Sequence, residues 1–148
     1  MLRTYCIFTL GLAFVVLATS DARAQERHPR LHAALHELRE AKRSIQDIPG
    51  PREGKKRDLV VAMDAAMDSI KLILNIKGDN FRGIDRSADF YKRYPDHPRL
   101  RAAMDSLRDA REELRDARAN FGGNRQRAVR DVNYAIDQIQ AWIDSHRR

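Results

Sequence analysis

Apolar residues recur at helical spacing in four long segments of the chain. The first segment begins at Pro29 and ends before the Pro-Gly-Pro of 49–51, because proline suits a first helical turn and disfavours helix in the residue before it. Two apolar rows with a spacing of seven residues run through it: Leu31, Leu38 and Ile45, and Ala34, Ala41 and Ile48. This pattern predicts a helix with one face turned to a core.

The other three segments have the same character. A second helix is expected over about 52–76, with Gly78 as its stop. A third begins at Pro98 and carries its own leucine and alanine rows, and a turn at 120–123 leads into a fourth that continues to within a few residues of the end of the chain. The alanine rows would let each pair of neighbouring helices approach closely.

The third segment repeats the first. Residues 97–100 and 28–31 both read His-Pro-Arg-Leu, and a gapless alignment of 28–74 with 97–143, at an offset of 69 residues, matches 15 of 47 positions. Chance would give about three matches, at roughly 6% identity for average amino-acid usage. We interpret the chain as a tandem duplication of a helical hairpin, with units 28–76 and 97–146 joined by a crossover at 77–96.

This organisation predicts an all-α fold. A lone helical hairpin leaves one apolar face in water, and repeated units solve this by packing on each other. The simplest arrangement is one helical domain over 25–148, a four-helix up-down bundle in up-down-up-down order. In that order both short loops lie at the same end of the bundle.

The first 24 residues have the form of a signal peptide. Arg3 opens a short basic head, an apolar run covers 6–18, and Ala22-Arg23-Ala24 resembles a signal-peptidase site. The run is too short for the roughly 20 residues that span a bilayer. We expect cleavage after Ala24 and a periplasmic or secreted protein. Because Cys6 is the only cysteine, the mature chain would have no disulfide, thiolate nucleophile or cysteine metal ligand.

The repeat resembles a known group of proteins. Its pattern is His-Pro-x-Leu, then alanines and leucines at helical spacing, then Phe-Gly-Gly-x-Arg, which stands here at 121–125. It resembles short secreted bacterial proteins of uncharacterised function, over 28–74 and 97–143. The resemblance implies helical hairpins and export, and it implies no activity. Similar proteins often have histidine after the two glycines, where this chain has Asn124.

Three histidines could form a metal site. His28, His32 and His36 stand four residues apart, so a helix places them in one column, and histidines spaced by four residues can share a metal ion. His32 and His36 are the candidate ligands, with His28 as a third. The second unit keeps only His97, at the position of His28, which favours a structural interpretation. Two imidazoles without cysteine predict weak binding.

The starts of the second and fourth helices are unusually basic. Cations oppose the helix dipole there by a few tenths of a kcal/mol each. With both short loops at one end, six cations would share one basic pole that attracts a multivalent anion. The alternative is that loops are simply basic in a chain of net charge +7. The candidate anion-binding residues are Lys55, Lys56, Arg57, Arg125, Arg127 and Arg130.

The crossover concentrates aromatic side chains. It holds Phe81, Phe90, Tyr91 and Tyr94. These rings have two interpretations: they cap the open end of the core, or they form a lid that lines a ligand site.

No catalytic motif is visible. Neither unit offers a nucleophile with an orienting base, a glycine-rich phosphate loop or a carboxylate pair in an apolar setting. The sequence therefore favours an exported non-enzymatic binding or scaffold protein, which engages an anionic polymer, a membrane surface or another envelope protein through the basic pole. A bundle that binds metal or a small ligand through the histidine column is the alternative, and an enzyme is the least favoured class. No cofactor is predicted.

Overall fold

The computed structural model describes residues 28–49, 54–79, 81, 83–84, 86–118 and 121–146. Over these ranges the chain is helical and contains no strand, which confirms the all-α class. The elements are α1 (Pro29–Gln46), α2 (Lys55–Ile76), α3 (Ala88–Tyr91), α4 (Pro98–Asp116), the 3-10 turn η1 (Phe121–Gly123) and α5 (Asn124–Ser145). The signal peptide predicted at 1–24 lies outside the described residues. None of the described helices is long and apolar enough to cross a membrane.

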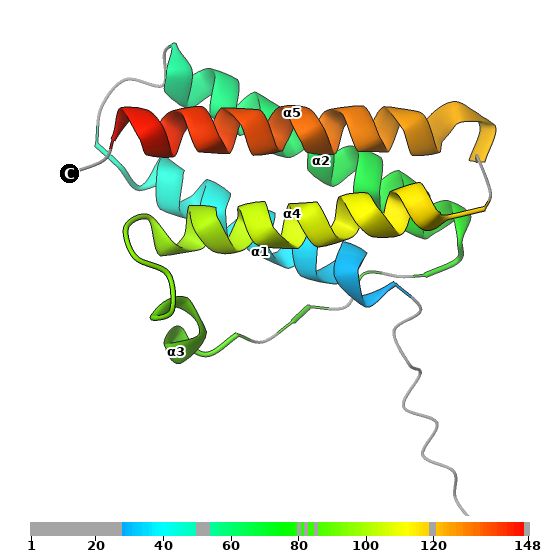
Figure 1. The fold of residues 1–148 in the computed structure, drawn as a ribbon, viewed down its shortest axis with the longest axis horizontal. Helices are drawn as coiled ribbons and strands as arrows, with labels where there is room; N and C mark the ends of the chain where they lie inside the picture. The colour runs from blue at the N-terminus through cyan, green and yellow to red at the C-terminus, as the bar shows by residue number, and fades with distance from the viewer. Residues whose placement is uncertain are drawn as a thin grey trace, which may run out of the picture.

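Helix α1 pairs mainly with α4, and α2 with α5 (Figure 1). Both pairs are antiparallel. His28 at the start of α1 lies 2.5 Å from Glu113 near the end of α4. Lys77, just past the end of α2, lies 5.1 Å from the centre of the Phe121 ring at the start of α5. Since α4 also ends beside the start of α5, helices α2 and α4 run in the same direction.

The predicted up-down-up-down order is therefore wrong. The four long helices run up, down, down and up, and the two short connections lie at opposite ends of the molecule (Figure 1). The reason lies in the crossover at 77–96, which returns along the whole molecule before α4 begins. At about 3.3 Å per extended residue it easily spans the roughly 33 Å of a 22-residue helix such as α2.

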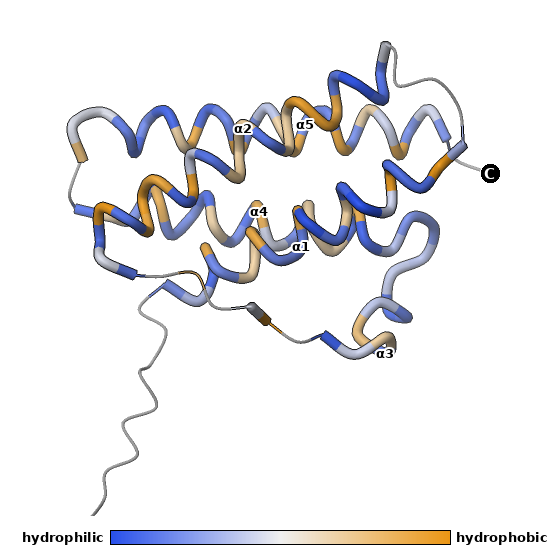
Figure 2. The backbone as a smooth tube through the Cα atoms, turned by 180° about the vertical axis from the view of Figure 1, so that it is seen from behind, coloured by the Kyte–Doolittle hydropathy of each residue, from blue (hydrophilic) through white to orange (hydrophobic). Residues whose placement is uncertain are grey.

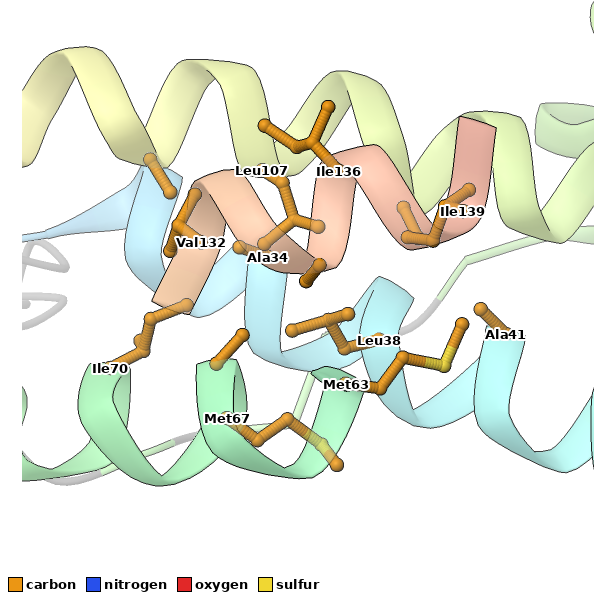
Figure 3. Close-up of a cluster of buried hydrophobic side chains, with 14 of the residues drawn as sticks. Ala34, Leu38, Ala41, Met63, Met67, Ile70, Leu107, Val132, Ile136 and Ile139 are labelled. Atoms are coloured by element: carbon orange, nitrogen blue, oxygen red, sulfur yellow. The ribbon is translucent and has the colours of Figure 1, made fainter. Parts of the chain in front are cut away.

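The core lies between the four long helices, and Figure 3 shows part of it. Leu38 and Leu107, at equivalent positions of α1 and α4, are both 0% exposed. Hydrophilic and hydrophobic positions alternate along each long helix, as expected for helices with one buried face (Figure 2). Ile48 and its equivalent Ala117 depart from the predicted rows, because α1 ends at Gln46 and α4 at Asp116. Ile48 is exposed and Ala117 is only partly buried.

Candidate functional site

A pocket of about 340 Å³ lies between α1, α3 and α4. We call it the crossover pocket. Helix α1 contributes two side chains one turn apart, the crossover three residues, and the first turn of α4 one arginine. The lining residues are His36, Glu40, Arg86, Ala88, Tyr91 and Arg99.

A buried carboxylate lies beside this pocket. The Glu37 side chain is 0% exposed, and its Oε2 accepts a hydrogen bond from the Tyr91 hydroxyl at 3.1 Å. Its Oε1 lies 3.3 Å from Nε of Arg86. Within the part of the chain described, neither of these two atoms has a well-aligned hydrogen bond. Removing a carboxylate from water costs several kcal/mol unless it is paired, so this contact ties the crossover to α1.

Two guanidinium groups flank the pocket, and each lies over an aromatic ring. The Arg86 guanidinium carbon is 4.3 Å from the centre of the Phe90 ring, and that of Arg99 is 5.5 Å from the centre of the Tyr91 ring. One Arg99 nitrogen donates to Glu40 at 2.8 Å. An arginine carries five N–H donors, so both groups keep donors that can bind a ligand.

The two interpretations of the aromatic crossover apply to different rings. Phe81 is partly buried and packs against the hydrophobic core. It also stacks on His32, with 5.8 Å between ring centres, and lies beneath the Arg39 guanidinium at 3.9 Å. Tyr91 instead lines the crossover pocket. Phe81 is thus part of the core covering, while Tyr91 is part of the pocket wall.

Tyr91 should titrate late. Burial, together with the nearby Glu37 carboxylate, raises the pKa of Tyr91 from 10.0 to about 12. A pKa raised in the folded state stabilises the protein fully below pH 10, and this contribution is lost as the pH rises through 12. Ultraviolet titration of the wild type and of Tyr91→Phe should therefore differ by one tyrosine that ionises near pH 12. If the tyrosine lost in Tyr91→Phe were instead one that ionises near pH 10, this result would contradict the contact between Tyr91 and Glu37.

The histidine column does not form one ligand set. His32 is fully buried, with Nε2 at 3.0 Å from the Asp79 carboxylate. His28 binds Glu113, and His36 faces the crossover pocket. Each step of four residues turns about 40° around a helix, so the three rings meet different neighbours. Among the described residues, no group of three or more His, Cys, Asp or Glu side chains is placed to hold a metal ion.

The predicted basic pole is wrong, because α2 and α5 begin at opposite ends of the molecule (Figure 1). The first cluster lies beside the end of α1 and the second beside the end of α4. The two separated sets are Lys55, Lys56 and Arg57, and Arg125, Arg127 and Arg130.

One cation of each cluster stabilises the preceding helix. Lys56 Nζ donates to the Ile48 carbonyl at 2.6 Å, and the Arg125 guanidinium donates to the Ala117 carbonyl, also at 2.6 Å. Both donors and both acceptors are equivalent at the 69-residue offset. Ile48 lies just past the end of α1 and Ala117 is the C-cap residue of α4, so both cations lie near the negative end of a helix dipole. Lys56 and Arg125 are therefore unfavourable to the dipole of the helix on which they lie, but they stabilise the end of the antiparallel helix that precedes it.

Removing either of these cations should lower stability. Lys56→Met and Arg125→Met are each expected to reduce the free energy of unfolding by about 1 kcal/mol, because a charge-assisted bond to a helix end is lost. Urea unfolding followed by circular dichroism measures this. Lys55→Met, at an exposed neighbouring position, is the control and should change stability by less than about 0.5 kcal/mol. Equal losses at Lys55 and Lys56 would contradict the capping role.

The sequence interpretation missed Glu37, although a signal was present. Glu37 stands three residues after Ala34 and four before Ala41, which places it on the predicted buried face of α1. The equivalent residue of the second unit is Ser106. A charged residue on a buried stripe needs a partner from another element, and this partner is Arg86.

Comparisons of the chain with protein-family models, curated proteins and solved structures found no match. The function is therefore inferred from the chemistry of the chain's own residues.

Proposed function

We propose that this chain is an exported, non-enzymatic binding protein built from two duplicated helical hairpins, and that its ligand site is the crossover pocket. The duplication is supported by the equivalent contacts of Lys56 and Arg125 with the ends of α1 and α4. Export is supported by the form of residues 1–24. N-terminal sequencing of the exported protein tests it, and the expected first residue is Gln25.

The observation that carries the proposal is the buried Glu37 beside a pocket flanked by two arginines. Glu37 itself is fully buried, and its Oε1, at 3.3 Å from Arg86, holds this arginine beside the pocket. Glu40, which lines the pocket, can accept a bond from a ligand. Arg86 and Arg99 offer donors to an anionic group. The fitting ligand is a small polar molecule with one anionic group and a nearby donor, such as an α-amino acid or a hydroxy acid.

Binding is favoured over catalysis by the lining of the pocket. His36, Glu40 and Tyr91 supply charge and hydrogen bonds, but the lining residues include no serine, threonine or cysteine nucleophile. The volume of about 340 Å³ falls at the lower end of the usual range for ligand pockets. A compact ligand therefore fits better than a polymer.

The test compares two arginines at equivalent positions. Arg99 lines the pocket, whereas Arg30, its counterpart at the start of α1, is exposed. Amino acids and hydroxy acids would be screened by thermal shift and confirmed by calorimetry. A true ligand should bind the wild type and Arg30→Gln equally, and Arg99→Gln about tenfold more weakly, as expected for one lost charge-assisted contact. Equal affinity for all three proteins would contradict the proposal.

A further inference from the structure

Two further pockets occupy equivalent positions in the two units. One of about 100 Å³ lies between α1 and α2, and we call it the first hairpin pocket. The second hairpin pocket, of about 330 Å³, lies between α4 and α5. Gln46, Lys56, Arg57, Val60 and Val61 line the first. The residues 69 positions later, Arg115, Arg125, Gln126, Val129 and Arg130, line the second together with Leu114.

The two pockets share an apolar floor and differ in charge. Val60 and Val129 are both partly buried and pack against the core. At two positions the first pocket has Gln46 and Val61, where the second has Arg115 and Arg130. At a third position the first has Arg57 where the second has Gln126, so the first lining carries two cations and the second three. The second pocket is larger and carries three arginines around its floor. It reaches the usual size range of ligand sites, whereas the first lies well below it.

The arginines of the second hairpin pocket are not neutralised by acids in the described structure. Arg125 donates to the backbone carbonyls of Ala117 and Arg115, at 2.6 and 3.3 Å. Arg115 and Arg130 are exposed, and the described ion pairs give neither of them a carboxylate partner. Like charges gathered around one floor repel each other, and a bound anion would relieve this repulsion.

The first turn of α5 adds to the attraction. The pocket is lined by residues of this turn, including Arg125 and Gln126. Its N-cap residue is Gly123, and no side chain caps the free N–H groups of the helix. These groups carry the positive end of the helix dipole, which favours an anion nearby.

We propose that the second hairpin pocket binds a small amphipathic anion, a carboxylate on a short hydrocarbon body, and that the first hairpin pocket does not. Arg115 and Arg130 contact the carboxylate, while Leu114 and Val129 cover the hydrocarbon. The apolar floor selects against inorganic anions, and the arginines select against uncharged hydrocarbons. This site is separate from the crossover pocket, so the proposal does not depend on the proposed function.

The experiment titrates octanoate into the exported chain by calorimetry. Arg115→Gln and Arg130→Val each replace an arginine of the second hairpin pocket with the residue found at the equivalent position of the first. Each should weaken octanoate binding about tenfold through the loss of one charge-assisted contact. Arg57→Gln, which copies Gln126 into the first pocket, is the matched control and should bind like the wild type. All three substitutions are at exposed positions, and circular dichroism verifies that each variant is folded.

Two further probes separate the contributions of charge and apolar contact. 1-Octanol and inorganic phosphate should each bind at least about tenfold more weakly than octanoate. Undetectable octanoate binding, equal affinity for the wild type and both pocket variants, or equal affinity for octanoate and 1-octanol would overturn the proposal. Arg99→Gln should leave octanoate binding unchanged, so failure here is distinct from failure at the crossover pocket.

Discussion

Leu38→Ala and Leu107→Ala are each expected to lower the free energy of unfolding by about 2–5 kcal/mol. Both side chains are 0% exposed and occupy equivalent positions in α1 and α4. Truncation to alanine removes buried apolar surface and leaves a cavity, because the close-packed surroundings relax only partly. Urea unfolding monitored by circular dichroism measures the loss in each variant relative to the wild type.

Ile48→Ala is the matched control for this pair. Ile48 continues the predicted alanine row of α1, but it lies beyond the end of the helix and is 38% exposed. Its truncation should cost less than about 0.5 kcal/mol. Losses below that value at both Leu38 and Leu107 would mean that the buried faces of α1 and α4 are wrongly assigned.

The helices and their buried faces could be predicted because they depend on local information. A leucine every seventh residue, as at Leu100, Leu107 and Leu114, marks one side of a helix wherever its partners come from. All three of these side chains are at most 2% exposed. Proline at the start of α1 and α4 fixed the helix boundaries in the same way.

The directions of the helices could not be predicted from these patterns. An apolar stripe packs equally well against a parallel or an antiparallel neighbour, and the crossover at 77–96 is long enough for either order. The contact between Lys77 and Phe121 shows which order the chain adopts. The predicted basic pole required the up-down-up-down order of the helices, so it is wrong because that order is wrong. The observation that cations cluster at the starts of α2 and α5 still holds.

The crossover pocket could not be predicted from the sequence for a related reason. His36 and Glu40 are recognisable as neighbours on α1, since they are one turn apart. Arg86 and Tyr91 lie beside these two residues because the crossover folds back over α1. No local sequence pattern predicts this contact. The charge at Glu37 on the buried face was the one local sign that such a partner existed.

Arg86→Met should be the most damaging substitution in the crossover. Glu37 is fully buried, and Arg86 is the cation that faces it at 3.3 Å, with a side chain that is 30% exposed. Removing the cation leaves a buried carboxylate without charge compensation, which typically costs 3–5 kcal/mol for a fully buried pair. Partial access of water to Arg86 reduces this penalty, so we expect a loss of about 3 kcal/mol in urea unfolding.

The reverse substitution should be milder. Glu37→Gln removes the charge and keeps an acceptor for the Tyr91 hydroxyl, while Arg86 can turn toward water. Its expected cost is about 1 kcal/mol. Once Glu37 is neutral, Arg86→Met has no buried charge to expose, so the double variant should lose much less than the sum of the two single losses. The difference in this double-mutant cycle is the coupling energy of the pair.

Lys92→Met provides the control for a lost cation in the same segment. Its side chain is 78% exposed and pairs with the exposed Asp89, so stability should change by less than about 0.5 kcal/mol. Additive losses for Glu37→Gln and Arg86→Met would show that the two side chains do not interact. The crossover would then be held to α1 by other contacts, among them those of Asp79 and Phe81 with His32, and the Glu37–Arg86 pair would lose its role in organising the pocket.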